Sequence, residues 1–395
     1  MKRDGMWIGR GEALVVAIAL ALGLSVFVPA ELRAEELKVG MSTALTGPAS
    51  ALGKGMVDGI QAVFDKVNKA GGVNGNTLKL VTLDDGYEPA RCAPHMRTLI
   101  DTQKVLAVLG NVGTPTAIVS VPIAIEGKTP LFGAFTGAGV LRKSPPDRYI
   151  INYRASYEEE TAAMVKGFLS AGIKAQEIAF FTQNDGYGDS GYEGAIKALL
   201  PHYADARKLA HGRYTRNTVN VEDALATIAE ASPKAIIMVG AYKPCAKFIK
   251  MAREFFPDAV FANVSFVGSM ALLNELGADA EGVIVTQVVP HFEADLSGVK
   301  QFREDMKAFG GRTPSFVSLE GYLVGTLFVE ALKKAGKAPS RESLVDAFEA
   351  LKDFDLGIGL KVSYSKQDHQ ASHTVWPTII HGGKYAPLAW SELKR

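Results

Sequence analysis

Cysteine is scarce in this chain, and neither sign of charge predominates. The 395 residues include two cysteines, Cys92 and Cys245, too few for a disulfide scaffold or a multi-cysteine zinc site. Lys and Arg number 43 against 42 Asp and Glu, so no basic excess points to nucleic acid or to an acidic membrane surface. The apolar run at 13–28 is shorter than the roughly 20 residues that a membrane-spanning helix needs.

The composition that remains is that of a globular protein. Hydrophobic residues make up 47% of the chain and charged residues 22%, which excludes a disordered or collagen-like protein. Because a domain averages about 150 residues, a length of 395 predicts two or three compact units.

The N-terminal segment 1–34 has the pattern of a secretory signal peptide. Basic residues precede the apolar run at 13–28, and Leu-Arg-Ala at 32–34 provides a cleavage site. We expect cleavage after Ala34, with Ala30 as the alternative. No cysteine precedes Cys92, so a lipid-modified cysteine at the cleavage site is excluded. The sequence therefore predicts an exported periplasmic protein without a lipid anchor.

Short apolar strands alternate with helical segments along the rest of the chain. In the first group, strands are expected at 37–42, 78–83, 105–110 and 131–134. After a crossing segment at 150–154, strands are expected at 178–182, 235–240, 260–264 and 282–289, and later ones at 362–364 and 374–381. This alternation favours two parallel sheets, each covered by helices.

Several short motifs follow one another at a recognisable spacing. Leu-Lys-Val-Gly at 37–40 is followed by Leu-Thr-Gly-Pro at 45–48 and by Lys-Ala-Gly-Gly-Val-Asn-Gly at 69–75. Asp84-Asp85 closes the second strand, and Tyr187-Gly188 follows a strand of the second group. In this order the motifs resemble the type I periplasmic solute-binding proteins of ABC transporters, in the leucine/isoleucine/valine-binding branch.

The resemblance implies an α/β fold of two lobes, each a parallel sheet covered by helices, joined by a three-crossing hinge. Lobe one would comprise 35–154 plus 288–371, and lobe two 155–287 plus 372–395. It also implies a monomer without a cofactor that captures a small carboxylate-bearing solute, with an amino acid favoured, and delivers it to an ABC permease. Two alternatives stay open: a binder of aromatic or short organic acids, and a ligand-sensing subunit of a receptor.

Candidate ligand contacts in lobe one follow two neighbouring strands. Thr114-Pro115 suits a helix start, with Thr114 as the N-cap, and backbone N–H groups at such a terminus bind carboxylates. A plain capped helix is the simpler interpretation. In the family, loops at these two positions bind the ligand's charged groups, which implies Thr114, Ala134 and Thr136 as contacts.

In lobe two the resemblance implies aromatic contacts. Tyr187 and Tyr242 would lie at the cleft, with Tyr157 just after the first crossing. Either Phe316 or Tyr322 would project from the helix of the third crossing. Aromatic side chains can cover an apolar ligand group, although core packing is an equally good explanation for them.

The chain departs from the family where amino-acid binders carry an acid for the α-ammonium. The aligned residue is Ser265, and Leu52 replaces a cleft tyrosine. Because a buried ammonium without a carboxylate partner is costly, either Glu158 or Glu320 substitutes for that acid, or the ligand has no ammonium.

The cysteines depart from the family as well. The disulfide of the branched-chain binders would need cysteines near Tyr87 and Gly113. Cys92 and Cys245 fall instead in helices of different lobes, where a bond would block closure, so we expect two buried thiols.

Three motifs suggest other chemistry on weak grounds. Gly-Asp-Ser-Gly at 188–191 matches a protease nucleophile motif around Ser190, but its strand–helix setting is wrong for those enzymes, and we expect no catalysis. His369 and His373 have metal-ligand spacing in what we expect to be a loop. The segment 137–142 lacks the third glycine of a dinucleotide site.

Overall fold

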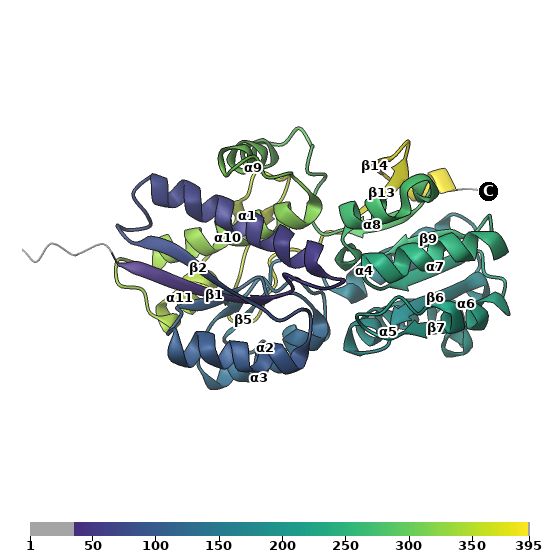
Figure 1. Ribbon diagram of the computed structural model, residues 1–395, viewed down its shortest axis with the longest axis horizontal. Helices are drawn as coiled ribbons and strands as arrows, with labels where there is room; N and C mark the ends of the chain where they lie inside the picture. Colours follow the sequence, from purple (N-terminus) through teal and green to yellow (C-terminus); the bar gives the residue numbers. More distant parts are fainter. Residues whose placement is uncertain (1–34, 394–395) are drawn as a thin grey trace, which may run out of the picture. The chain divides into compact units, whose positions relative to one another are not determined.

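The computed structural model describes residues 35–393, so the predicted signal peptide lies outside the described residues. Two main sheets organise this part, each with helices on its faces (Figure 1). We call the part built on each sheet a lobe. Within 35–393 no helix is both long enough and apolar enough to cross a membrane.

The sheet of the first lobe is entirely parallel. Its strand order is β2-β1-β3-β4-β5, with β1 Glu36–Thr43, β2 Thr77–Asp84, β3 Ala107–Leu109, β4 Leu131–Phe132 and β5 Ile150–Ile151. Helices α1 (Ser50–Lys69) and α10 (Phe316–Ala335) lie on one face, and α2 (Pro89–Arg97) and α3 (Thr114–Glu126) on the other (Figure 1). Helices α9 (Ser297–Ala308) and α11 (Arg341–Glu349) complete this lobe, with the small hairpin β11 (Phe354–Asp355) and β12 (Lys361–Val362).

The second sheet is mixed, with order β14-β13-β10-β9-β8-β6-β7. Its parallel strands are β6 Ile178–Gln183, β7 His211–Tyr214, β8 Ala235–Val239, β9 Val260–Asn263 and β10 Ile284–Gln287. The helices are α4 Tyr157–Ser170, α5 Gly186–Leu199, α6 Glu222–Ala229, α7 Tyr242–Phe255 and α8 Ser269–Leu276. Strand β8 is a continuous buried apolar run, as expected for a strand covered on both faces.

The antiparallel edge of the second sheet differs from the predicted all-parallel arrangement. Strands β13 (Trp376–His381) and β14 (Lys384–Pro387) form a hairpin that pairs with β10. Gly382 and Gly383, both at positive φ, make the two-residue turn between them. Because so short a turn can join antiparallel strands only, the hairpin adds an antiparallel edge.

The chain passes between the lobes three times, as predicted. The first and third crossings lie side by side, since the Asn152 amide donates to the His369 carbonyl at 2.7 Å and the Ser372 amide donates to the Tyr153 carbonyl at 2.8 Å. The second crossing follows β10 and leads to α9.

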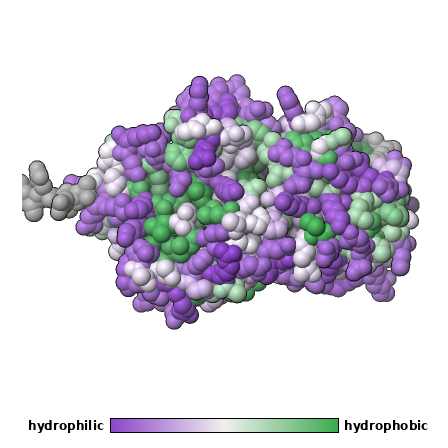
Figure 2. Space-filling model, in the orientation of Figure 1, coloured by the Kyte–Doolittle hydropathy of each residue, from purple (hydrophilic) through white to green (hydrophobic). Residues whose placement is uncertain are grey.

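Apolar side chains fill the cores of the lobes, and polar side chains cover most of the visible surface. Figure 2 shows a mainly hydrophilic face, with hydrophobic residues visible over the first lobe between α1 and α2.

Both cysteines are free and buried, as predicted. Burial raises the pKa of the Cys92 thiol to about 11, so it is protonated at neutral pH.

Candidate functional site

The loop after β3 leads into the helix start that the sequence predicts as a carboxylate site. Gly113, at φ 101°, is the N-cap residue, and Thr114 is the first residue of α3 rather than its cap. The Thr114 hydroxyl instead lies 2.7 Å from the hydroxyl of Thr136 in the loop after β4. The structure therefore brings together Thr114 and Thr136, two residues from separate loops that we predicted as ligand contacts.

The loop after β4 places Ala134 beside this hydroxyl pair. The Thr136 amide donates to the Ala134 carbonyl at 2.8 Å, and Ala134, Thr114 and Thr136 are all buried. The Tyr157 amide donates to the Gly137 carbonyl at 2.9 Å, which connects this loop to the start of α4 in the other lobe. Three predicted lobe-one contacts thus lie next to a predicted lobe-two contact.

Aromatic rings from both lobes pack together next to these loops. Tyr157 and Tyr187, both predicted, have ring centroids 5.2 Å apart. Phe266, in the loop after β9, lies 4.5 Å from Tyr187, 5.4 Å from Phe135 and 5.8 Å from Tyr87. The sequence analysis missed Phe135 and Phe266 as cluster members, although both adjoin residues that it named.

Phe316 contacts a different set of side chains. Its ring packs edge-on against Phe292 at 5.0 Å and Tyr385 at 5.5 Å, near the second crossing and the C-terminal hairpin. The alternative, Tyr322, donates its hydroxyl to Asp305 at 2.6 Å. The structure thus brings neither residue into the aromatic cluster.

Tyr242 is the first residue of α7 and is buried. Its ring faces Gly268, where an added Cβ would meet Tyr242 at 3.5 Å and Leu52 at 2.5 Å. The structure therefore brings Tyr242 close to Leu52, the residue that replaces the family's cleft tyrosine.

A fully buried guanidinium, Arg154, lies at the centre of this region. It contacts the Ser265 hydroxyl, and its Nη2 lies 3.4 Å from Glu160 Oε1. Its Nε lies 3.7 Å from Glu320 Oε1. The guanidinium carbon also sits 4.8 Å from the ring centroid of Phe135. The sequence analysis did not predict this charged centre.

Glu160, on α4, forms hydrogen bonds with Ser265. Its carboxylate accepts hydrogen bonds from the Ser265 amide at 2.7 Å, the Ser265 hydroxyl at 2.9 Å and the Thr286 hydroxyl at 2.6 Å. A buried acid therefore lies next to Ser265, but its carboxylate oxygens already accept hydrogen bonds from Ser265 and Thr286.

The two acids that the sequence analysis named as substitutes differ sharply in environment. Glu158 has a 52% exposed side chain and pairs with Lys197 at the surface. Glu320 is 3% exposed and pairs with Arg154. Burial raises the pKa of Glu320 to about 7, and Arg154 opposes that rise.

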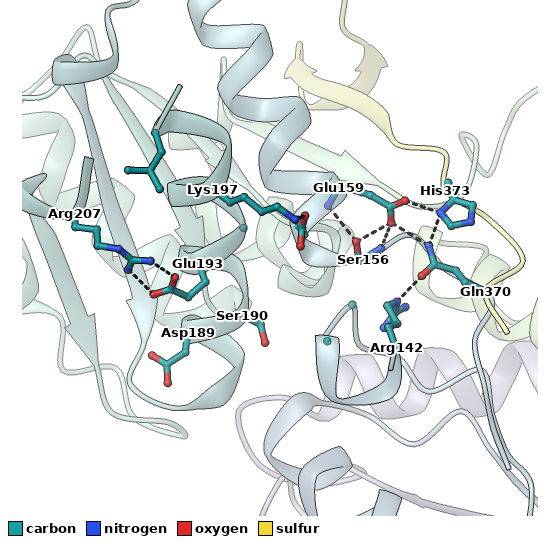
Figure 3. Close-up of a pocket in the computed structure, with 15 residues that line it drawn as sticks. Arg142, Ser156, Glu159, Asp189, Ser190, Glu193, Lys197, Arg207, Gln370 and His373 are labelled. Carbon is teal, nitrogen blue, oxygen red and sulfur yellow. Dashed lines mark hydrogen bonds and ion pairs between the residues drawn. The ribbon is translucent and has the colours of Figure 1, made fainter. Parts of the chain in front are cut away.

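A surface pocket of about 860 Å³ opens beside the hinge and is drawn in Figure 3. On the hinge side of the pocket the polar side chains form hydrogen bonds with one another. Gln370 accepts from Arg142 at 2.7 Å and donates to Glu159 at 3.0 Å. The His373 ring nitrogen lies 2.6 Å from Glu159. These bonds connect the Thr136 loop, α4 and the third crossing, so we interpret this network as part of the hinge.

The residues suggestive of other chemistry have structural contacts. His369 is buried against the Ile150 carbonyl at 2.9 Å, whereas His373 faces Glu159, so the two imidazoles do not converge. Across the described residues, no three His, Cys, Asp or Glu side chains are arranged to hold a metal ion. Ser190 lies on α5, across the pocket from His373 (Figure 3).

Comparison with known proteins places this fold in a family. The family model described as periplasmic binding protein matches residues 36–384. A crystal structure of a possible leucine/isoleucine/valine-binding protein from Rhodopirellula baltica is 51% identical, with a TM-score of 0.89, over 91% of this chain and 98% of that one. A Leu/Ile/Val-binding protein homolog from Brucella melitensis is 24% identical over 91% of this chain and 93% of its own length.

One further relative, an amino acid binding protein of Pseudomonas aeruginosa, is 25% identical over 83% of this chain and 85% of its own length. The matched family consists of periplasmic solute-binding proteins rather than enzymes. The family model matches nearly all of the described residues, and the two-lobed fold agrees with membership of that family. The chain therefore belongs to the periplasmic binding protein family, with the type I fold, and resembles the relatives named Leu/Ile/Val-binding proteins.

Proposed function

We propose that this protein captures a small carboxylate-bearing solute, with an amino acid favoured, and delivers it to the permease of an ABC transporter. The observation that carries the proposal is that Thr114 and Thr136 of the first lobe lie beside Tyr157 and Tyr187 of the second lobe. The names of the relatives, which refer to leucine, isoleucine, valine or amino acids, support the choice of ligand.

Lobe closure supplies the mechanism, and no covalent step is involved. A ligand that contacts both lobes binds the closed form better than the open form, so its binding energy shifts that equilibrium. The lobes contact each other in this structure: Arg216 pairs with Glu88 at 2.8 Å, and the Gln183 amide donates to the Tyr87 hydroxyl at 3.1 Å. The permease would then recognise the closed protein, which we propose acts as a monomer.

Two other functions remain as alternatives. An aromatic or short organic acid is favoured by the serine at position 265, where an amino-acid binder would carry an acid. A receptor subunit on the same fold would also close on its ligand. The neighbouring genes would discriminate these functions: permease and ATPase genes would favour transport, and a sensor kinase gene would favour signalling.

A thermal-shift screen of the mature protein tests the proposed function. Amino acids and aromatic or short organic acids are added one at a time. A true ligand at 100 times its dissociation constant should stabilise the folded protein by about 2.7 kcal/mol. Stabilisation by none of these acids would contradict the proposal.

Export is expected to remove residues 1–34. The basic start, short apolar run and Ala34 predict that the mature protein begins at Glu35. Intact-mass measurement of the protein from a periplasmic extract checks this expectation. A mass that retains the first 34 residues would show that the segment is not a cleaved signal.

Replacing Thr114 with alanine is expected to weaken ligand binding by about 1.5–3 kcal/mol, the range for a hydrogen bond to a charged group. The protein should still fold, at a cost of about 1–3 kcal/mol, because the hydroxyl caps no helix but the buried Thr136 hydroxyl loses its 2.7 Å partner. Thr227→Ala is the matched control, since that exposed hydroxyl bonds to its own helix. Calorimetry that finds equal affinity in both variants removes Thr114 from the site.

A further inference from the structure

A second set of contacts between the lobes lies far from the crossings in the strand order of both sheets. The first crossing follows β5, at one edge of the first sheet, and β2 forms the other edge. The second crossing follows β10, and β7 is the edge strand on the far side of the second sheet. The segments after β2 and β7, at 85–88 and 215–220, contact each other. Because displacement in a rotation grows with distance from the axis, these contacts separate early when the lobes rotate apart.

Glu88 receives these contacts on the first lobe. Its carboxylate accepts from Arg216 Nη2 at 2.8 Å and from the Asn217 side-chain amide at 2.6 Å, and that amide also donates to the Gly86 carbonyl at 3.1 Å. Arg216 donates to Asp185 of its own lobe at 3.1 Å, so its guanidinium lies between one acid from each lobe. The Arg216 side chain is 23% exposed and that of Glu88 39%. Charge-assisted hydrogen bonds are stronger than neutral ones, and salt screens a partly buried pair less than an exposed one.

The backbone on both sides adopts uncommon conformations to make these contacts. Tyr87 has φ 66°, which is rare for a residue with a large side chain, and its amide donates to the Asp85 carboxylate at 2.8 Å. Asn217 has φ 59°, a conformation that asparagine adopts more readily than most residues. Backbone strain persists only where the surrounding contacts hold it, and it is frequent in switch regions. Strain at Tyr87 therefore fits a segment that takes part in lobe closure.

Tyr87 connects these contacts to the candidate site. The Arg216 guanidinium carbon lies 6.0 Å from the Tyr87 ring centroid, and the Tyr87 hydroxyl accepts from the Gln183 amide of the other lobe at 3.1 Å. The same ring packs on Phe266 and against Gly113, the N-cap residue of α3. Tyr87 is buried, so the contacts of Arg216 close this edge of the candidate site.

We propose that Glu88, Arg216 and Asn217 form a clasp that holds the lobes of the ligand-free protein closed and has to release before a solute can enter. The clasp sets the ratio of closed to open molecules before any solute binds. It also makes that ratio depend on salt, because the Arg216–Glu88 pair is partly exposed and dissolved ions screen it. The proposal goes beyond the proposed function, since it concerns the protein without its solute.

Single-molecule energy transfer between one dye on each lobe measures the ratio of closed to open molecules. Lys54→Cys on α1 and Lys250→Cys on α7 place the dyes at exposed positions, and the two native cysteines are buried, so labelling is selective. The mature protein is first dialysed to remove any bound solute. At about 0.1 M sodium chloride we expect the closed form to predominate.

Two variants remove the clasp in different ways. Glu88→Gln keeps the size of the side chain and removes its charge, so the ratio of closed to open molecules should fall about threefold to tenfold. Helix α2 should be unaffected, because the Glu88 side chain makes no capping hydrogen bond. Asn217→Gly should lower the ratio about twofold to fivefold, since glycine keeps the left-handed backbone and removes the amide that bonds to Gly86 and Glu88.

Each variant has a matched control. Glu126→Gln removes an acid whose partner, Arg97, belongs to the same lobe. Asn220→Gly changes an exposed asparagine in the same loop as Asn217. Neither control should change the ratio of closed to open molecules.

Salt provides an independent test of the ion pair. Raising sodium chloride to about 1 M, where the screening length falls to about 3 Å, should lower the ratio in the wild type and leave it nearly unchanged in Glu88→Gln. Equal ratios in the wild type, Glu88→Gln and Asn217→Gly would overturn the clasp, and so would a wild type that is mainly open at the lower salt concentration. Neither result bears on the proposed function, which the solute screen tests separately.

Discussion

Replacing Glu160 with alanine is expected to lower the free energy of unfolding by about 3–5 kcal/mol, the cost of removing one partner from a buried ion pair. The Glu160 side chain is fully buried, and its loss would leave Arg154 without one of its two countercharges. The Ser265 amide and the Thr286 hydroxyl would also lose their acceptor. Urea unfolding of the ligand-free protein, followed by circular dichroism, measures the change.

The matched control is Glu193→Ala. Glu193 pairs bidentately with Arg207, but both side chains are more than half exposed. Exposed pairs of this kind contribute about 0–1 kcal/mol. If both variants unfold at the same urea concentration, the charged centre around Arg154 is not the stabilising element described above.

Replacing Gly113 with alanine should destabilise the protein by about 2–5 kcal/mol, from combined overpacking and backbone strain. The glycine has φ 101°, and an added Cβ would lie 2.0 Å from Cε2 of the buried Tyr87 ring. Since Tyr87 packs on Phe266 and Gly113 caps the helix of Thr114, ligand affinity should fall as well.

Gly139→Ala is the matched control for this variant. Gly139 lies in a neighbouring segment of the same lobe, its φ is not positive, and an added Cβ would meet nothing within 4 Å. Thermal unfolding of the two variants should therefore differ clearly, and calorimetry gives the affinities. Equal stability of the two variants would show that the loop before α3 tolerates a side chain and does not position the site.

The sequence predicted the fold well where the pattern is local. Apolar strands followed by helices predicted the parallel strands of both sheets except β5, which we expected as a crossing segment, and β7. Strand β7 was missed because its sequence, His-Gly-Arg-Tyr, has no apolar run, and its neighbours rather than its composition decide its pairing. The sequence pattern predicts this helix at 192–200, but α5 begins at Gly186; the glycines at 186 and 188 favour a loop. Asp185 caps the helix there by accepting from the Tyr187 amide at 3.0 Å.

The local structure of the candidate site was predictable where one short segment forms it. Thr114-Pro115 marked a helix start, and the resemblance placed Tyr157 and Tyr187 together. The charged centre was missed because its members come from a crossing, α4, the loop after β9 and α10, which are far apart in the sequence. One signal was present: Glu160 lies on the buried face of α4 with Tyr157, Thr161 and Met164, where an acid needs a partner.

Calorimetric titration of the mature protein with a carboxylate and its carboxamide tests the central claim most directly. L-leucine and L-leucinamide share an ammonium and a side chain and differ in the carboxylate. The proposed function predicts saturable one-to-one binding of leucine and at least a tenfold loss of affinity for the amide, because we propose Thr114 and Thr136 as the contacts of the ligand's carboxylate. Equal affinity for leucine and its amide would contradict the account.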